Sequence, residues 1–521
     1  MTVPVDLAQR LAQSGLKPQP VDSHVHFTVA PNAVPDLAVR LVEQEGYEFA
    51  TLVVEQTDEG FRLRYFFYAH DGAGLVELST EAAEGEPFTA ISDRVHAADW
   101  HEREAEDLFE IKFTGHPFLG DFVLHDTDWP EGVAPMRRDF DIRQGALERG
   151  RGDAWMPRRL LDEPGALLFP VGPVWGGYAE SGLYLLETTG EQIRDLQTRL
   201  FYKYRGVEKI AEGRQPDSAL LLAERFSGSS AFAHALAYCQ ALETITGTIV
   251  PARAAVLRVV LAELERLRYH AAVIAEIAGS TALAVGQALA QEIEEDLLRL
   301  TGTVCGHRYL FGLAAPGGLA FEPARERLAQ LRAAIPPLAM RLQQLERLLT
   351  RSSSFLDRLE EMGTLPPELA QSFTAVGPVG RASGRKVDLR VQLPYAAYPN
   401  YLPDLATESE GDGYARLRVF FAEAHVSARL IATALDSLTD GPVRADWQPR
   451  AGHALGWAEA PAGAAFHWVR LDADGTIGRW RAGTPGFRNW HAFHRAFAGA
   501  AFQDFPIILA SFGLSVAESD R

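Results

Sequence analysis

Cysteine is almost absent from this 521-residue chain. Its two cysteines, Cys239 and Cys305, lie far apart in the sequence and outside any CxxC pair. An iron–sulfur cluster or an all-cysteine zinc site takes four sulfur ligands. We therefore expect no such centre to be held by this chain alone.

Positive charge and long apolar runs are also scarce. The chain has 50 Lys and Arg against 69 Asp and Glu, a formal net charge of −19, so a nucleic-acid backbone would be repelled. The most apolar long stretch, residues 271–290, is interrupted by polar residues, whereas a membrane-spanning helix needs about 20 predominantly apolar residues. The N-terminus has no basic region followed by an apolar one. We expect no nucleic-acid partner, no signal peptide, no transmembrane helix and a cytoplasmic location.

Glycine-rich phosphate-binding motifs are missing as well. No GxGxxG follows a predicted strand, and the nearest approach to a phosphate loop, GPVGRASGRK from Gly377, has the wrong spacing. We therefore expect no dinucleotide to be bound by this chain.

The patterns that are present predict an α+β protein. Apolar and polar residues alternate through residues 22–68, which predicts strands, with one helix at 35–44. Residues 143–165 are rich in Arg, Gly and Pro and predict a linker. Long amphipathic stretches at 219–246, 253–278 and 282–301 predict a helical bundle. The expected order is a small α/β domain (1–142), a linker (143–165) and a mainly α-helical bundle domain with small β elements (166–521).

Seven apolar residues between 328 and 349 follow a 3-4 spacing and therefore share one helix face. They are Leu328, Leu331, Ile335, Leu338, Leu342, Leu345 and Leu349. Because this seam is short, it favours core packing over a zipper between chains. Pro336 and Pro337 interrupt the pattern and predict two helices or a sharp kink.

Two histidine pairs suggest metal sites that their surroundings do not complete. His24 and His26 resemble the HxH of metal-dependent amidohydrolases, in which alternate strand residues face one metal. The strand–helix units that would supply further ligands do not follow, so an alternating strand with surface or partly buried histidines is favoured. His491 and His494 share a helix face without a nearby carboxylate pattern, which predicts a solvated face.

Residues 99–140 carry a long motif, ERExxDLFxIxFxGHP. It resembles the C-type (30 kDa-type) subunit of NADH-quinone oxidoreductase (complex I) and the matching domain of membrane-bound hydrogenases. The charged residues Glu102, Arg103, Glu104 and Asp107 fall at helical spacing. The resemblance implies a docking element without a redox centre of its own.

Residues 169–521 resemble the D-type subunit of the same complex and the large subunit of group 4 nickel–iron hydrogenases. The matching pieces stand in the family's order and include GPVWGGYAESG, YKYRGVEK, ERFSGSSAFAHALAYCQALE, LAELERLRYH and DFPIILASFGLSVAESDR. The fused C-then-D order implies a peripheral, hydrophilic core subunit of a membrane-bound, ion-translocating oxidoreductase. Implied partners are a small subunit with an iron–sulfur cluster, a membrane subunit of the H type and antiporter-like membrane subunits.

The four hydrogenase ligand positions have lost their cysteines. Ser227, Ser230, Ser515 and Glu518 stand there. A serine hydroxyl stays protonated near neutral pH and is a poor donor to nickel or low-spin iron. We expect no nickel–iron centre and no cofactor bound by this chain. The terminal Asp520-Arg521 also resembles the ending of the D-type subunit and not a precursor tail.

The ending favours quinone chemistry, although the family's two quinone-pocket side chains are replaced. Trp175 stands at the pocket histidine and Gly228 at the pocket tyrosine. The resemblance offers five candidates for the lining of the ancestral cavity: Glu180, Tyr202, Arg205, Glu208 and His234. A buried pair such as Arg205 with Glu208 could equally tie a loop to a helix. Two functions stay open: a subunit that couples electron transfer, with quinone as a possible ligand, to ion transport, or a scaffold without redox chemistry.

Overall fold

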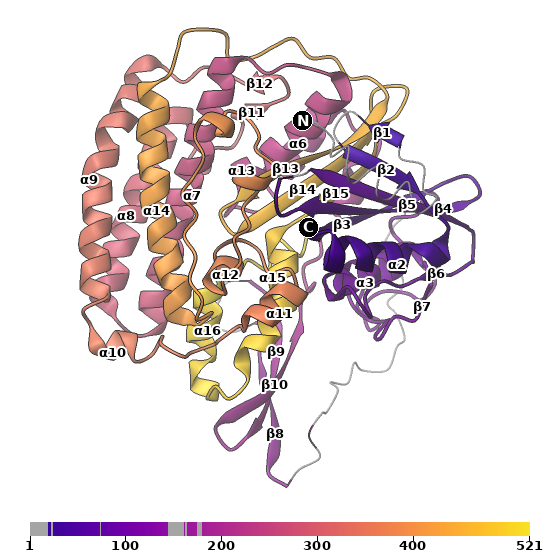
Figure 1. Cartoon of the computed structure of the whole chain (residues 1–521), viewed down its shortest axis with the longest axis horizontal. Helices are drawn as coiled ribbons and strands as arrows, with labels where there is room; N and C mark the ends of the chain where they lie inside the picture. The colour runs from indigo at the N-terminus through magenta and orange to yellow at the C-terminus, as the bar shows by residue number, and fades with distance from the viewer. Residues whose placement is uncertain (1–18, 22–23, 73, 144–160, 162–163, 175–179) are drawn as a thin grey trace.

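The computed structural model describes residues 19–21, 24–72, 74–143, 161, 164–174 and 180–521 (Figure 1). Its N-terminal part, up to residue 143, contains a five-stranded sheet in the order β1-β2-β5-β4-β3. The strands are β1 (Gln19–Val21), β2 (His24–Thr28), β3 (Tyr47–Gln56), β4 (Gly60–Ala69) and β5 (Leu75–Ala83). β2 and β5 pair in parallel, and the other neighbours pair antiparallel.

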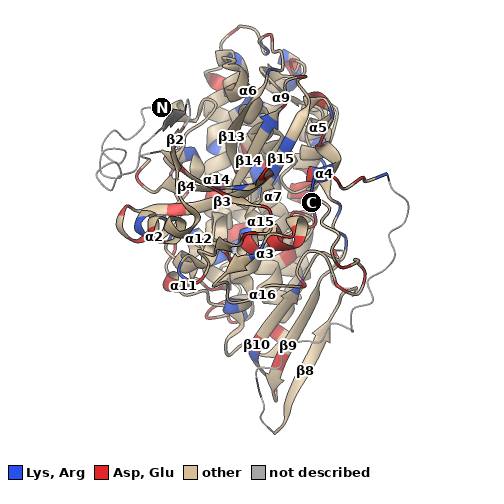
Figure 2. Cartoon of the chain, turned by 90° about the vertical axis from the view of Figure 1, so that its right-hand side faces the viewer, with Lys and Arg blue, Asp and Glu red and all other residues tan. Residues whose placement is uncertain are grey.

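Short helical elements connect and flank this sheet. Between β2 and β3 lie η1 (Pro31–Ala33), α2 (Val34–Val39) and the π-helix η2 (Arg40–Gln44), which confirms the helix predicted at 35–44. After β5 come β6 (Phe88–Thr89), η3 (His96–Ala98), α3 (Asp99–Phe109) and β7 (Phe113–Thr114). In Figure 2, α3 lies beside α15 (Pro485–Phe493) of the C-terminal part. The contact is direct, because the Trp100 ring lies 5.4 Å from that of Phe487.

Both faces of the sheet are covered, since nearly every residue of β3 and β4 is buried. The polar residues that alternate along these strands therefore pair inside the protein. Arg64 bridges Glu55 at 2.6 Å and Glu77 at 2.5 Å. His24 Nε2 lies 2.7 Å from Glu77, and His26 Nε2 lies 2.6 Å from Ser79 Oγ. His24 is thus buried, which corrects the expected surface or partly buried histidine pair.

The histidines of β2 have too few further ligand side chains nearby, among the described residues, to hold a metal ion. Among the described residues, no group of three or more His, Cys, Asp and Glu side chains could hold a metal ion. The HxH pattern arises instead from two strand residues whose side chains pair with the neighbouring parallel strand β5.

The C-terminal part is built around five long helices, α6 (Ala231–Thr246), α7 (Ala252–Ser280), α8 (Ala284–Cys305), α9 (Arg325–Leu349) and α14 (Gly413–Asp436). α7 packs against α8 and α14, and α9 packs against α8 and α14 (Figure 1). The stretches predicted at 253–278 and 282–301 are confirmed as α7 and α8. The stretch predicted at 219–246 is divided, because α5 (Pro216–Ala223) ends before a serine-rich loop.

α9 is one continuous helix through Pro336 and Pro337, so the prediction of two separate helices is wrong, and a kink at the prolines stays a prediction. All seven seam residues are buried, as predicted for core packing. A proline inside a helix costs about 3 kcal/mol. Burial of each large aliphatic side chain contributes about 1.5–3 kcal/mol. Seven buried side chains therefore outweigh two prolines and keep the helix whole.

Smaller elements complete the C-terminal part. A three-stranded sheet, β8 (Ala166–Val171), β9 (Leu183–Thr189) and β10 (Gln192–Arg199), projects from the body (Figure 1). A second sheet, β13 (Gly452–Ala460), β14 (Gly463–Leu471) and β15 (Ile477–Gly483), packs on α6 and against β3. The remaining elements are α4 (Val207–Ala211), β11 (Ala314–Ala315), β12 (Gly318–Leu319), α10 (Ser353–Leu356), α11 (Pro367–Ser372), α12 (Gly377–Ala382), α13 (Leu389–Gln392), η4 (Tyr398–Asn400), η5 (His494–Phe497), η6 (Phe502–Asp504) and α16 (Phe505–Phe512).

The architecture is α+β, as predicted, and two large buried apolar clusters each combine side chains of both parts. Side chains of β3 and β4, such as Val53 and Phe66, join the same buried cluster as those of α6 and α7. Most of the predicted linker 143–165 lies outside the described residues, so the boundaries at 142 and 166 stay predictions. No helix in the described portion of the chain combines the length and the apolarity that crossing a bilayer requires.

Candidate functional site

The four positions singled out in the sequence lie on two segments that the fold brings together. One is the serine loop (residues 224–230) between α5 and α6, and the other is the C-terminal segment (residues 513–521) after α16. Glu518 Oε1 accepts hydrogen bonds from Ser230 Oγ at 2.9 Å and Ser227 Oγ at 3.2 Å. Its Oε2 accepts one from the Gly486 amide at 3.0 Å. We call this group of Ser227, Ser230 and Glu518 the serine site.

Two buried histidines extend the serine site inward with defined tautomers. Trp480 Nε1, which can only donate, lies 3.1 Å from His467 Nδ1. His467 therefore carries its proton on Nε2, which lies 3.0 Å from His234 Nδ1. His234 in turn carries its proton on Nε2, which lies 3.7 Å from Glu518 Oε1. The N–H groups of this row thus all point toward the carboxylate.

The charge state of Glu518 follows from these donors. Burial disfavours its charged form, but the interactions with His234 and Ser230 outweigh burial, so the pKa of this carboxyl lies below its usual value. Burial holds the pKa of His467 well below its usual value. At neutral pH Glu518 is therefore a carboxylate, and His467 is a neutral imidazole.

Glu180 and Ser515 form a second carboxylate contact beside the serine site. Ser515 Oγ donates to Glu180 Oε1 at 2.9 Å, and the amides of Val516 and Ala517 donate to Glu180 Oε2, the latter at 3.2 Å. Glu180 thus holds the start of the C-terminal segment. The predicted candidate Glu180 is brought to the same neighbourhood as the four ligand positions.

Two arginines tie the serine loop to its surroundings. Arg205 donates to the carbonyls of Phe226 and Asp520, each at 2.9 Å. Arg268 donates to the Ser229 carbonyl at 2.8 Å. The suggested ion pair of Arg205 with Glu208 is wrong, because the guanidinium of Arg205 is used by backbone carbonyls instead.

Glu208 belongs to a buried ion cluster that joins the two parts of the molecule. Its carboxylate lies 3.0 Å from Arg479, 3.4 Å from Arg481 and 3.2 Å from Arg521. Burial opposes its charge, but the arginines outweigh burial and lower the pKa of Glu208 to about 2. From α3, Glu104 pairs with the same Arg481 at 2.6 Å and Arg521 at 2.8 Å, which fits the docking role implied for this helix.

The remaining candidates are not all drawn together. Tyr202 packs on His125 of the N-terminal part, with ring centroids 4.9 Å apart. Gly228 is exposed, and a Cβ built on it would meet open space, so the loop has room for the tyrosine of the family. Trp175 lies outside the described residues. His234 is fully buried in the row of donors described above.

The oxygen atoms of the serine site that could bind a metal form hydrogen bonds to each other. Three hydroxyls and one backbone amide converge on Glu518, so the hydroxyl protons already have an acceptor. Nickel and low-spin iron prefer thiolates, and hydroxyls that donate to a carboxylate are not available as anionic ligands. The residues present do not fit a nickel–iron centre.

Two residues of this neighbourhood were not predicted from the sequence. His467 lies on β14, where the sequence does not indicate that this polar side chain is buried. Arg268 stands inside LAELERLRYH, a piece noted for resemblance and not for a role. Both contact the serine loop or its histidines only through the fold.

Comparison with known families divides the chain in the order that its sequence suggested. The respiratory-chain NADH dehydrogenase 30 Kd subunit family matches residues 27–146. The corresponding 49 Kd subunit family matches residues 285–451 and 443–521. The nickel-dependent hydrogenase family matches residues 205–274, which include the serine loop.

Several known proteins are similar over most of their length. Hydrogenase-4 component G of Escherichia coli (strain K12) is 30% identical over 95% of this chain and 88% of its own. Formate hydrogenlyase subunit 5 of the same organism is 30% identical over 86% and 79%. The C/D fusion subunit of NADH-quinone oxidoreductase from Acinetobacter baylyi is 27% identical over 81% and 78%.

A solved structure shares the fold. It is a chain of the membrane-bound sulfane sulfur reductase, an archaeal respiratory membrane complex. The TM-score is 0.65 at 24% identity, and the match covers 68% of this chain and 99% of that one. At this identity the similarity concerns the fold alone.

Proposed function

Because the chain belongs to the family of fused complex I 30 kDa/49 kDa-type subunits, which is homologous to hydrogenase-4 component G and formate hydrogenlyase subunit 5, we propose that it is a hydrophilic core subunit of a membrane-bound, ion-translocating oxidoreductase. In this proposal the chain holds no nickel–iron centre. Electrons reach its neighbourhood through an iron–sulfur small subunit, and membrane subunits of the H and antiporter types carry the ion.

One observation carries the proposal. The four positions that would hold the metal still meet in space, but they bear three hydroxyls and a carboxylate, and those of Ser227, Ser230 and Glu518 hydrogen-bond to each other. In this proposal the chain keeps the fold of the family but has no cysteine ligands for a metal centre at these four positions. A subunit of this kind can respond to a partner's redox state only through its contacts or through a bound acceptor such as quinone.

A second candidate function is a scaffold without redox chemistry of its own. It is favoured by Glu208, the candidate for a proton path. Three arginines hold this carboxyl ionised, with its pKa lowered to about 2, so it has little tendency to take up a proton near neutral pH. Its geometry suits a structural tie between α4 and the C-terminal segment.

Purification of the tagged full chain from its native membranes tests the proposal. We expect an iron–sulfur subunit and membrane subunits to co-purify, and elemental analysis to find iron but no stoichiometric nickel. Stoichiometric nickel on this chain, or a chain that purifies alone without any membrane-embedded companion, would overturn the proposal.

Turnover of the purified complex separates the two candidates. Quinone-dependent turnover supports the electron-coupling subunit and argues against the scaffold. The variant Glu208→Gln then tests the proton path. Loss of turnover in an assembled complex would favour such a path, whereas unchanged turnover would remove it.

A further inference from the structure

A cavity of about 580 Å³ lies between the two parts of the molecule, and none of the residues that line it belongs to the serine site. We call it the interdomain cavity. Its walls come from α3 of the N-terminal part and from β10, the end of α11, α15 and η5 of the C-terminal part, represented by Trp100, Arg103, Phe373, His491 and Arg495. Its volume falls within the roughly 300–1,000 Å³ of small-molecule sites.

The two arginines of this cavity lack ionic partners. Among the described residues, no carboxylate lies within ion-pair distance of Arg103 or Arg495, and neither side chain donates a hydrogen bond. The guanidinium of Arg103 lies over the Phe122 ring at 4.1 Å, and that of Arg495 lies over the Phe373 ring at 5.7 Å. Arg103 Nε is fully buried without a hydrogen-bond acceptor. Burial lowers the pKa of Arg103, and the charges of nearby carboxylates, Asp99 first, offset burial only in part. A guanidinium nitrogen buried without an acceptor is costly unless a ligand supplies one.

Three aspartates line the cavity, Asp99, Asp121 and Asp195, and the first two pair with other side chains of the protein. Asp121 pairs with Arg199 through both oxygens, at 2.5 and 3.2 Å. Asp99 Oδ2 lies 3.2 Å from His491 Nε2. Asp99 Oδ1 is buried and accepts no hydrogen bond, although the His116 ring lies 3.4 Å away. The cavity therefore offers an anion two guanidinium groups and offers a hydrogen-bond donor one carboxylate oxygen.

Aromatic rings line much of the space between these groups. The His491 ring stacks on Trp100 at 5.4 Å and meets the Phe373 ring edge-to-face at 4.7 Å. Trp100 also contacts Phe122 at 5.2 Å. Such walls suit a flat aromatic body, because rings gain both apolar contact and stacking. The sequence predicted His491 on a solvated face, and its burial here corrects that prediction.

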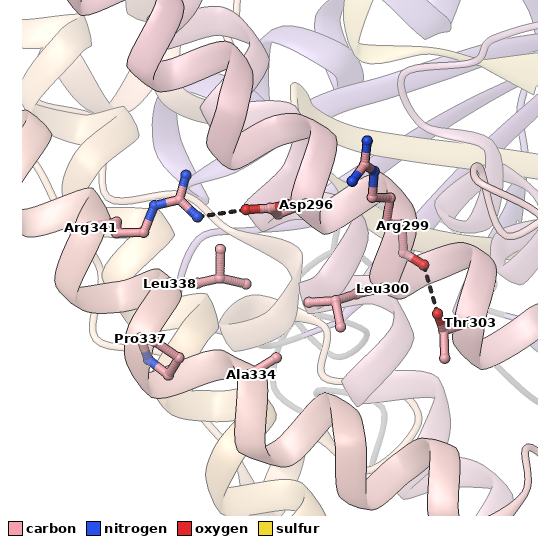
Figure 3. A pocket seen from close by; sticks show the side chains of 8 residues that line it. All are labelled: Asp296, Arg299, Leu300, Thr303, Ala334, Pro337, Leu338 and Arg341. Atoms are coloured by element: carbon pink, nitrogen blue, oxygen red, sulfur yellow. Dashed lines mark hydrogen bonds and ion pairs between the residues drawn. The ribbon is translucent and has the colours of Figure 1, made fainter.

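A second, smaller cavity serves as a comparison, because its charged side chains are paired with other residues of the chain. It holds about 310 Å³ between α8 and α9 (Figure 3). There Arg341 pairs with Asp296 at 2.5 Å, and Arg299 pairs with Glu295 at 2.9 Å. Its charges are compensated within the chain, so it gives no indication of a charged ligand.

We propose that the interdomain cavity binds a small aromatic anion that also carries a hydrogen-bond donor. The anionic group pairs with Arg103 and Arg495, the ring lies against Trp100 and Phe373, and a hydroxyl or amino group donates to Asp99 Oδ1. Because both parts of the molecule supply walls, the ligand also stabilises their contact. Arg103 was noted in the sequence only as part of a docking motif.

Fluorescence titration of the full chain tests the proposal, since Trp100 and Trp490 line the cavity. The probe is 3-hydroxy-2-naphthoate, which carries a ring, a carboxylate and a hydroxyl. We expect saturable quenching of tryptophan fluorescence. 2-Naphthol, which lacks the carboxylate, should bind at least tenfold more weakly, and 2-naphthoate, which lacks the hydroxyl, a few-fold more weakly.

Arginine variants assign the binding to this cavity. Arg103→Gln should weaken binding of the probe at least tenfold, and Arg495→Gln, at the exposed rim, a few-fold. The matched control Arg351→Gln removes an exposed arginine just after α9 and should bind like the parent. If Arg103→Gln fails to fold, the Arg495→Gln variant carries the test.

Two results would overturn the proposal. Equal affinity for 2-naphthol and 3-hydroxy-2-naphthoate, or parent-like binding by both arginine variants, would show nonspecific apolar binding. Loss of probe binding in the assembled native complex, with binding retained by the isolated chain, would show that a partner subunit and not a small molecule occupies the cavity.

Discussion

At the serine site, Glu518 accepts hydrogen bonds from serine hydroxyls and from the Gly486 amide, whereas in the interdomain cavity Arg103 has no partner among the described residues. Both groups are charged; Glu518 is buried, and Arg103 is half-buried with its Nε shielded from water. The hydrogen-bonding groups of the serine site satisfy each other, whereas those of the interdomain cavity do not. A charge compensated within the fold stabilises the fold, while an uncompensated one is a candidate for ligand binding.

The largest effect is expected at the serine site. Glu518→Gln replaces an acceptor of several hydrogen bonds by an amide whose NH2 group faces donors. We expect the free energy of unfolding to fall by about 3 kcal/mol, measured from the urea unfolding transition. Glu295→Gln, which loses only exposed contacts with Arg299 and Arg308, is the matched control and should leave stability nearly unchanged. Equal stability of the two variants would contradict a structural role for the serine site.

The dependence of stability on pH tests one histidine in each region, His467 beside the serine site and His494 at the interdomain cavity. Burial is the main cause that lowers the pKa of His467, and it lowers the pKa of His494 to about 3. Both stay neutral in the folded state, while in the unfolded state they take up a proton below about pH 6.5. The unfolded state then binds more protons, so stability is lost as pH falls, by at most about 1.4 kcal/mol per pH unit for each group.

Glutamine variants of these histidines sharpen the comparison. His467→Gln and His494→Gln should each reduce the slope of unfolding free energy against pH between about 6.5 and 4.5. At pH 8, His467→Gln should be the less stable of the two, because Trp480 donates to His467. An unchanged slope in both variants would show that other groups govern the acid response.

Binding of the probe in the interdomain cavity should raise the free energy of unfolding, and this increase should not depend on the serine site. At ten times its Kd, 3-hydroxy-2-naphthoate should raise the free energy of unfolding by about 1.4 kcal/mol. The Glu518→Gln variant should show the same increment, because its carboxylate hydrogen-bonds to no residue that lines the cavity. A probe that stabilises the Arg103→Gln variant equally well would refute binding through the guanidinium.

The smallest stability effect is expected for Arg103→Gln. Its guanidinium lies over the Phe122 ring face and forms no ion pair or hydrogen bond among the described residues, and such a ring contact contributes about 0.5–1 kcal/mol near a surface. We therefore expect stability to change by less than about 1 kcal/mol in the urea transition, although probe binding weakens at least tenfold. A loss as large as that of Glu518→Gln would place Arg103 among the structural charges.

Local patterns predicted much of the fold. The strands β3 and β4, the helices α7 and α8 and the buried seam of α9 follow from periodicity, because period and apolar content are local properties. The single α9 does not follow, since the proline penalty is local and the burial that outweighs it is not. The same holds for His24, which alternation predicted as a surface or partly buried residue and which tertiary packing buries.

The candidate site divides in the same way. Resemblance located Ser227, Ser230, Ser515 and Glu518, and the chemistry of their side chains was enough to exclude thiolate ligation. The buried pair suggested for Arg205 and Glu208 as a structural alternative does not form, because nearness in sequence does not show which of several acceptors a long side chain reaches.

By itself the sequence excluded one kind of site, since two cysteines cannot supply four thiolates wherever they lie. It also determined the family, through motifs kept in order along the chain. Only the tertiary structure decided which charges are compensated. Whether Glu518 and Arg103 find partners depends on segments hundreds of residues apart, and pairing through space is a property of the packed chain and not of local order.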